Sequence, residues 1–81
     1  MIEGLSEAQT AGLEVIAAIA ERPVDELERR HEMVADLGID SPKALRLLLD
    51  LEDRLDIEIS DEAAARMDTV GDVLDQLAGV G

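Results

Sequence analysis

The sequence has 81 residues, of which 20 are acidic and seven basic, giving a formal net charge of −13, and it contains no Cys, Phe, Tyr or Trp. This composition excludes a disulfide framework and cysteine metal sites, and the negative charge makes nucleic acid and anionic membranes poor partners. The length predicts a single domain, residues 1–81, with a small core of aliphatic side chains.

Two further properties concern location and partners. The longest apolar stretch, VIAAIA at 15–20, is too short to span a bilayer, and the first residues lack the basic start of a signal peptide. We therefore expect a cytoplasmic protein that does not bind membranes. Its net charge favours a monomer and favours encounter with basic surfaces of other proteins.

The first predicted helix covers residues 6–21. Ser6 and Gln9 have the spacing of a capping box, in which each side chain bonds the backbone N–H of the other. Pro23 is expected to end the helix, because proline disfavours helical geometry in the residue before it. Apolar residues recur at helical spacing and should form the buried stripe, at Leu13, Ile16, Ile19 and Ala20.

Residues 23–40 form a long connection without a sustained apolar period. A helical turn is expected around Asp25–Arg30, and Gly38 permits a sharp bend just before the next helix. Long ordered connections in compact domains are often functional. The scattered apolar residues are expected to anchor this segment, at Val24, Leu27, Met33, Val34 and Leu37.

The second helix, residues 41–55, has the clearest amphipathic pattern. Its apolar face is predicted to contain Ala44, Leu48, Leu51 and Leu55, with Leu45 and Leu47 on the flanks. Its polar face contains Lys43, Arg46, Asp50, Asp53 and Arg54. Leu49 falls outside the main apolar stripe, so it either contacts another helix or is presented to a partner.

The C-terminal part is predicted to contain two further helices. DIEIS at 56–60 alternates like a strand but has no strand to pair with, so we expect an extended connector that buries Ile57 and Ile59. Ser60 can cap a short helix at 61–66, the least firmly held of the helices, and Thr69 can cap a last helix at 69–78. The last helix should face inward with Val70, Val73, Leu74 and Leu77. The expected fold is all-α, a small bundle of three main helices plus one short helix.

The sequence lacks the usual elements of an enzyme. Its single histidine, His31, lies in the charge-rich stretch LERRHE, and a small bundle offers little room for the pocket that a Ser41–His31 pair would need. No second histidine, calcium loop or glycine-rich phosphate loop is present. We therefore expect no catalytic residue and no metal site.

Ser41 is the residue with the most distinctive surroundings, in DLGIDSPKAL at 36–45. If Asp40 is the N-cap, Ser41 lies in the first turn with its hydroxyl in solvent, and Pro42 is compatible with that turn. The start of a helix favours phosphate, so a phosphodiester on Ser41 would be tolerated. The alternative is that Ser41 only initiates the helix.

DLGIDS, an amphipathic helix and then LEDRLDIEISDEAAARMDTVGDVLDQL strongly resemble the acyl carrier protein family, from about Val34 to Leu77. The resemblance implies that Ser41 carries 4′-phosphopantetheine, transferred from coenzyme A by a phosphopantetheinyl transferase. The thiol of this arm would hold an acyl group as a thioester, and the protein would be a carrier rather than an enzyme. The implied partners are an acyltransferase or acyl ligase, a ketosynthase and other acyl-processing enzymes.

Two departures from the family pattern bear on the pathway. Pro42 follows the serine where the family usually has leucine, and Lys43 and Arg46 lie on a helix side that is usually acidic. SPKAL also resembles the SLKA stretch of peptidyl carrier domains, although those usually read GG where this chain has GI. We expect a discrete carrier of polyketide or other specialised metabolism rather than of housekeeping fatty acid synthesis. An aminoacyl or peptidyl carrier and a cofactor-free acidic interaction module are the alternatives.

Partners are expected to dock on the second helix beside Ser41. The alternative for Arg46 is that it only pairs with Asp50, a contact worth about 0.3–0.5 kcal/mol. The residues predicted for docking are Asp40, Pro42, Lys43, Leu45, Arg46 and Leu49.

Overall fold

The computed structural model describes residues 2–80, and within them the chain forms four α-helices and no strand. The helices are α1 (Glu7–Ala20), α2 (Ser41–Leu55), α3 (Asp61–Ala65) and α4 (Val70–Leu77), and a 3₁₀ turn, η1, covers Val24–Glu26. This confirms the predicted all-α fold with three main helices and one short one.

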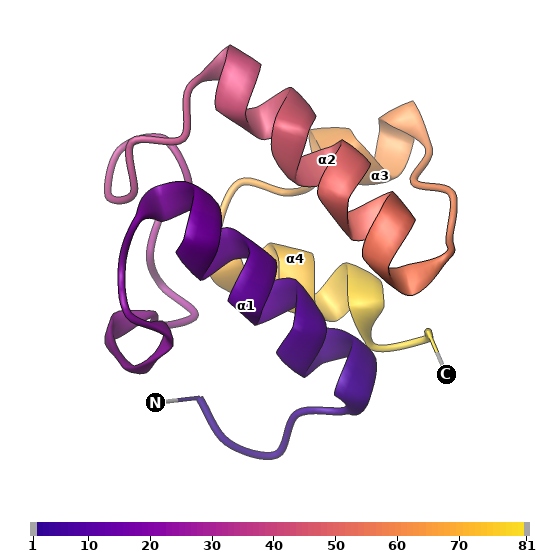
Figure 1. The fold of residues 1–81 in the computed structure, drawn as a ribbon, viewed down its shortest axis with the longest axis horizontal. Helices are drawn as coiled ribbons and strands as arrows, with labels where there is room; N and C mark the ends of the chain where they lie inside the picture. The colour runs from indigo at the N-terminus through magenta and orange to yellow at the C-terminus, as the bar shows by residue number, and fades with distance from the viewer. Residues whose placement is uncertain (1, 81) are drawn as a thin grey trace.

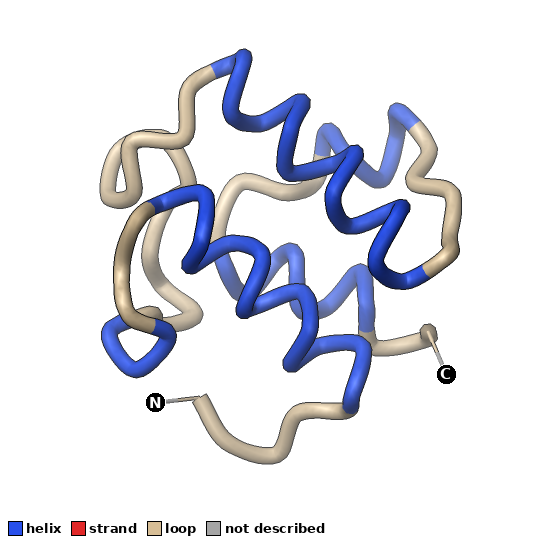
Figure 2. Tube along the Cα trace, viewed as in Figure 1, coloured by secondary structure: helices blue, strands red, loops and turns tan. Residues whose placement is uncertain are grey.

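The bundle is built around α1, which packs against both α2 and α4. Figure 1 shows α2 above α1, α4 behind it and α3 behind α2, while the connection from α1 to α2 closes one end of the bundle. Apart from η1 that connection is irregular, as Figure 2 shows. None of the helices in residues 2–80 combines the length and the apolar character needed to cross a membrane.

The core is aliphatic, and it draws on every helix except α3. The long connection contributes as many side chains to this core as α1 does, so it is an integral part of the domain. No polar side chain in the described residues is buried. The core consists of Leu13, Val15, Ile16 and Ala17 of α1, Leu27, Met33, Leu37 and Ile39 of the connection, Leu47 and Leu51 of α2, and Val70, Val73, Leu74 and Leu77 of α4.

At the ends of α1 the predicted capping box is confirmed, but Glu21 rather than Pro23 ends the helix. The capping box is present, since Ser6 Oγ accepts from Gln9 N and Gln9 Oε1 accepts from Ser6 N. The helix ends at Ala20, before Pro23 could act, because Glu21 adopts the left-handed conformation with φ 57°. Arg22 N then donates to Ala17 O at 3.0 Å, which closes the end of the helix.

The side of α2 that faces the core differs from the prediction. Leu47, placed on a flank by the sequence pattern, is 3% exposed, whereas Leu48 of the predicted stripe is only half-buried. Leu47 and Leu51 are one turn apart, and both belong to the core. Leu48 lies at the hollow beside α3, which Leu47 also lines, and α3 contributes no side chain to the core.

Three predicted apolar anchors are less buried than expected. Val34 is 69% exposed, and Ile57 and Ile59 in the extended connector are only half-buried. The predicted helical turn at 25–30 is the shorter 3₁₀ turn of η1. Each residue lies in a segment whose path is set by neighbouring helices, so local sequence carries little information about its burial.

The connection is tied to the start of α4. Val70 N donates to His31 O and Gly71 N to Arg29 O, both at 2.9 Å, while Met33 N donates to Asp68 O. The first two bonds use N–H groups of the first turn of α4, which have no partner within the helix, and the third has its donor in the connection. They hold the connection firmly on the side of the bundle from which it leads into α2.

Candidate functional site

The N-terminus of α2 presents the serine singled out in the sequence. Asp40 is the N-cap, and its Oδ1 accepts from Lys43 N at 3.2 Å. Ser41 is therefore the first helical residue and Pro42 the second, a position that needs no N–H donor. Ser41 is exposed, and no hydrogen bond among residues 2–80 engages its hydroxyl. The hydroxyl is free for chemistry because Asp40 already performs the capping.

The segment before Ser41 is a tight, internally bonded turn. Glu32 N donates to Asp36 Oδ2 at 2.7 Å, and Gly38 N donates to Val34 O at 3.0 Å. Ile39 is 1% exposed, and its N–H donates to Met33 O at 2.9 Å. These contacts hold the turn on the core immediately before the exposed pair Asp40 and Ser41, so the hydroxyl has a fixed position.

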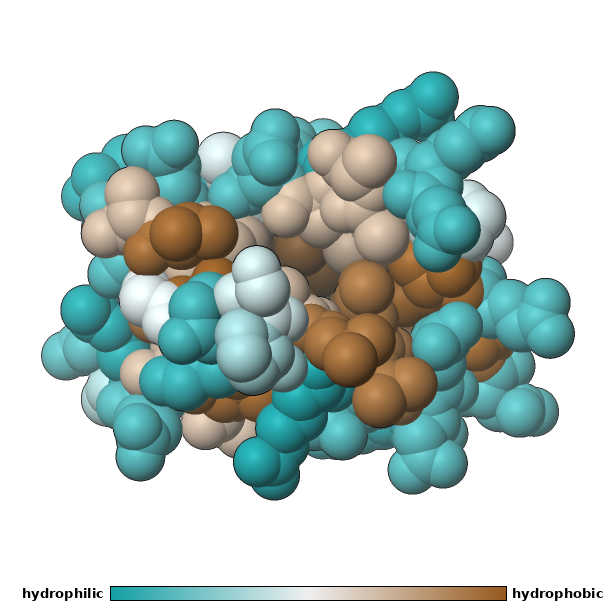
Figure 3. Space-filling view, turned by 90° about the horizontal axis from the view of Figure 1, so that it is seen from above, coloured by the Kyte–Doolittle hydropathy of each residue, from teal (hydrophilic) through white to brown (hydrophobic). Residues whose placement is uncertain are grey.

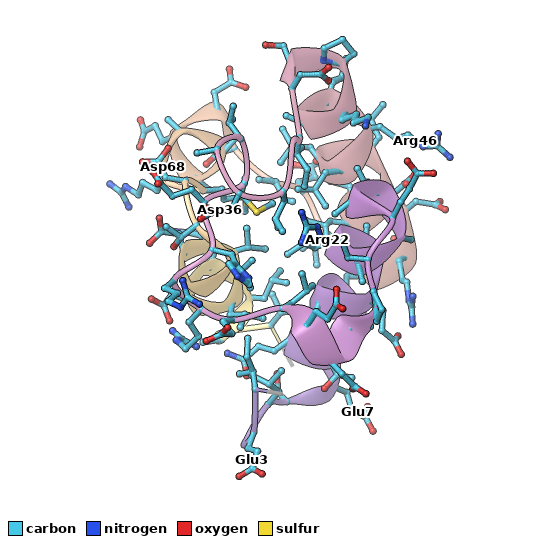
Figure 4. All side chains as sticks on the ribbon, turned by 90° about the vertical axis from the view of Figure 1, so that its left-hand side faces the viewer. Glu3, Glu7, Arg22, Asp36, Arg46 and Asp68 are labelled. Atoms are coloured by element: carbon cyan, nitrogen blue, oxygen red, sulfur yellow. The ribbon has the colours of Figure 1, made fainter. Side chains whose placement is uncertain are left out.

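Arg22 links this turn to the end of α1. Its Nη2 donates to Asp36 O at 3.2 Å, and Figure 4 shows the side chain directed inward toward the connection. Figure 4 also shows Arg46 extending outward from α2 into solvent. The two arginines thus differ in role, since one is used within the domain and the other is presented.

Gly38 permits the bend before Ser41. Its replacement should lower stability through backbone strain alone, without a steric clash. Its φ is +67°, and a Cβ added there would have no heavy atom within 4 Å. Gly38→Ala should lower the free energy of unfolding by about 1–2 kcal/mol, and Gly38→Asn by less, because asparagine tolerates the left-handed region better. Urea unfolding followed by circular dichroism measures both values.

Gly79→Ala is the matched control for this prediction. A Cβ there also meets nothing within 4 Å, but its backbone lies outside the positive-φ region. It should change stability by less than about 0.5 kcal/mol. An equal loss at both glycines, or a larger loss for asparagine than for alanine, would contradict this account of the bend.

Most of the predicted docking residues lie on the exposed side of α2. Leu45 is 59% exposed and Leu49 is 56% exposed, and the side chain of Arg46 is 77% exposed. Asp40, Pro42 and Lys43 are also exposed. The structure therefore exposes all six residues, from the N-cap Asp40 to Leu49 in the middle of α2.

A hollow lies between α2 and α3, beside the short helix that the sequence predicted to be the least firmly held. It is a cavity of about 90 Å³, and Figure 3 shows apolar side chains gathered around a depression on this face of the molecule. Met33 and Val34 in the connection and the alanine run in α3 are apolar in the sequence, but local pattern does not indicate that the two segments meet. The lining residues are Met33, Val34, Ile39, Ala44, Leu47, Leu48, Ala64 and Met67.

His31 has a structural role in the described chain. Its Nδ1 accepts from Glu28 N at 3.0 Å, and its carbonyl accepts from Val70 N at the start of α4. No hydrogen bond connects it to Ser41 in residues 2–80. Within the same residues no three potential ligands among His, Cys, Asp and Glu are grouped to hold a metal ion.

A family model described as a phosphopantetheine attachment site matches residues 13–77, which include Ser41. An acyl carrier protein of Exiguobacterium is 40% identical over 65 residues, covering 76% of this chain and 82% of that protein. The chain belongs to the acyl carrier protein family. Its cofactor is 4′-phosphopantetheine, and like other acyl carrier proteins it is a carrier rather than an enzyme.

Two further similarities extend this relationship. A component of the polyunsaturated fatty acid synthase of Thraustochytrium is 36% identical over 74 residues, which cover 90% of this chain but only 3% of that much longer protein. The solved structure of an acyl carrier protein from Enterococcus faecalis matches with a TM-score of 0.73 and 26% identity, over 94% of this chain and all of that one. The same carrier domain thus occurs as a discrete protein and within a large synthase.

The start of α2 fits the phosphopantetheine group. The group is attached through a phosphodiester, which requires an accessible hydroxyl and tolerates the positive end of a helix. Ser41 supplies an exposed hydroxyl without a hydrogen-bond partner in the described residues, at the first position of a 15-residue helix. When the arm is attached, its terminal thiol would hold the acyl group as a thioester.

Proposed function

We propose that Ser41 Oγ carries the phosphopantetheine arm and that the carrier shuttles acyl thioesters between the enzymes of a polyketide or related pathway. The observation that supports the site is the exposed, unengaged hydroxyl at the first position of α2, within the matched region 13–77. The partners in this proposal are a phosphopantetheinyl transferase, an acyl-loading enzyme and acyl-processing enzymes such as a ketosynthase.

Asp40 caps α2 and Ser41 does not, so attachment of the arm to Ser41 is compatible with folding. Asp40 accepts from Lys43 N through its side chain and from Ala44 N through its carbonyl, at 3.2 and 2.7 Å. Pro42 has no N–H, and Lys43 N already donates to Asp40. Among the first three helical residues, only Ser41 N therefore remains to donate to the phosphate. A phosphodiester on Ser41 replaces no contact that the helix needs.

The site is tested by the intact mass of the protein after incubation with coenzyme A and a broad-specificity phosphopantetheinyl transferase. The wild type should gain one phosphopantetheine group and Ser41→Ala none. Ser41→Ala should also keep its free energy of unfolding within about 0.5 kcal/mol of the wild type, because Asp40 is the cap.

Ser60→Ala is the matched control, since Ser60 Oγ caps α3 by accepting from Ala63 N at 3.1 Å. This variant should gain the arm normally and lose about 1 kcal/mol of stability. An arm on Ser41→Ala, or an unmodified wild type with several transferases, would show that Ser41 is not the attachment residue.

The pathway rests on the residues beside Ser41. Pro42, Lys43 and Arg46 depart from the pattern usual in the family, which favours partners of a specialised pathway. The mass of the group bound to protein purified from its native host tests this. An acyl group of polyketide type is expected, and a bound amino acid would favour the peptidyl carrier alternative that SPKAL suggests.

A further inference from the structure

Basic side chains are scarce in this protein, and most of them are used within the domain. Of seven Lys and Arg residues, three arginines pair with carboxylates away from the start of α2. Arg22 is occupied by the carbonyl of Asp36. The three ion pairs are Arg29–Asp75, Arg30–Glu28 and Arg54–Glu14.

Two of the remaining basic residues, Lys43 and Arg46, lie side by side near Ser41. Lys43 is the only lysine in the sequence, and its side chain forms no ion pair within residues 2–80. Arg46 is held loosely, with Nε 3.7 Å from Asp50 Oδ2 and 77% of the side chain exposed. An exposed pair of this kind is worth less than about 1 kcal/mol, so both cations are available to a partner.

The two cations border a shallow hollow between α1 and α2. This hollow has a volume of about 340 Å³, and Ala18 and Ile19 of α1 line it together with Lys43 and Arg46. Glu21 and Asp50 also line it, and only Asp50 approaches a cation closely enough to count as an ion pair. A carboxylate from another protein could enter here and reach both basic groups.

Apolar surface adjoins the cations along the same helix. Leu45 and Leu49 are more than half exposed and are one turn apart, so they offer apolar surface that a partner could bury. With a rise of about 1.5 Å per residue, the span from Ser41 to Leu49 is about 12 Å, which is within the reach of one docked protein. Successive residues turn by about 100°, which places Lys43 roughly 160° around α2 from Ser41 and its future phosphate.

We propose that the enzyme that loads the acyl group docks on α2 through a surface with carboxylates opposite Lys43 and Arg46 and an apolar patch opposite Leu45 and Leu49. This inference rests on the proposed attachment of the arm to Ser41. The formal net charge of the carrier is −13, so enzyme carboxylates are attracted only where cations are exposed, and Lys43 and Arg46 are exposed cations on the helix that begins at Ser41. Attraction at this place favours an orientation in which the start of α2 faces the enzyme.

The single lysine allows a direct test by zero-length carbodiimide cross-linking. The probe is the acyltransferase or acyl ligase encoded beside the gene for this chain, mixed with the carrier bearing its phosphopantetheine arm. The expected product joins the Lys43 amine to an Asp or Glu of the enzyme and is identified by peptide mass spectrometry. Lys43→Arg keeps the positive charge but removes the only side-chain amine, so this variant should lose that cross-link.

Other cross-links would overturn the proposal. Bonds only between enzyme lysines and carrier carboxylates would show that the docking surface of the enzyme is basic. Bonds from Lys43 to carboxylates of a second carrier would show that this face of α2 pairs copies of the chain. The N-terminal amine, which lies in a different peptide, is distinguished from Lys43 by the mass analysis.

Charge reversal supplies the kinetic test. Lys43→Glu and Arg46→Glu should each reduce kcat/KM for acyl loading by roughly tenfold at low salt, and the difference from wild type should shrink as salt is added. Glu at position 43 is compatible with folding, because an acid three residues after the cap Asp40 is favourable at a helix start. Arg66→Glu at the end of α3 makes the same change in net charge and should stay within twofold of wild type.

The outcome separates this inference from the proposed function. If the arm is added to Ser41 in every variant but loading is unchanged or faster in Lys43→Glu and Arg46→Glu, the acidic docking surface is wrong and the attachment site stands. If the wild type gains no arm by intact mass, the proposed function itself has failed.

Discussion

Leu51→Ala is expected to lower the free energy of unfolding by about 2–5 kcal/mol. Leu51 is 0% exposed on the side of α2 that meets α1, where its Cδ2 would lie 3.6 Å from a Cβ placed on Gly12. That separation is an ordinary contact, whereas the same Cβ would overlap Leu77 Cδ1 of α4, so Leu51 lies where α1, α2 and α4 meet in the core and its truncation leaves an enclosed cavity. A domain of this size has only roughly 4–12 kcal/mol in total, so a measurable unfolded fraction is expected.

Leu49→Ala is a control in the same helix with the same change in side chain. Because Leu49 is 56% exposed, its truncation should change the free energy of unfolding by less than about 0.5 kcal/mol. The measurement is urea unfolding by far-ultraviolet circular dichroism, since the chain has no Trp or Tyr for fluorescence. Similar losses for the two variants would mean that α2 faces the core differently from the arrangement described.

Backbone amides in α3 are expected to exchange with solvent at least about a hundredfold faster than those in the middle of α2. α3 has five residues, none of them buried, and a helix this short is unstable without tertiary packing. The relevant amides of α3 are Ala64 N and Arg66 N, which bond Ser60 O and Ala63 O at 2.9 and 3.1 Å. Hydrogen exchange followed by nuclear magnetic resonance gives both rates on one sample.

The same experiment on loaded protein connects this mobility with function. The cavity of about 90 Å³ between α2 and α3 is too small for a long acyl chain, so the chain can enter only if α3 moves outward. An octanoyl thioester on the arm should slow exchange in α3 by burying it against the chain, while an acetyl thioester, too short to reach, should not. Exchange in α3 as slow as in α2 before loading would contradict the proposed mobility.

The helices and their ends were predictable from the sequence, because the signals are local. Ser6 with Gln9, Asp40 with Lys43, and Thr69 with Asp72 each place a side chain within reach of the backbone N–H three residues away, whatever the rest of the chain does. The sequence left open whether Asp40 or Ser41 is the cap, and the structure assigns Asp40, which leaves Ser41 exposed. The family resemblance depended on this local pattern as well.

Facts that depend on two distant segments were decided only by the tertiary structure. The sequence pattern placed Leu48 on the core-facing stripe of α2 and Leu47 on its flank, whereas packing in the domain buries Leu47 and leaves Leu48 half-buried. The exposure of Val34, the hollow beside α3 and the availability of Lys43 likewise depend on where separate helices meet. The spacing of apolar residues indicates which side of a helix can be buried. Which other element buries that side is set by packing across the whole domain.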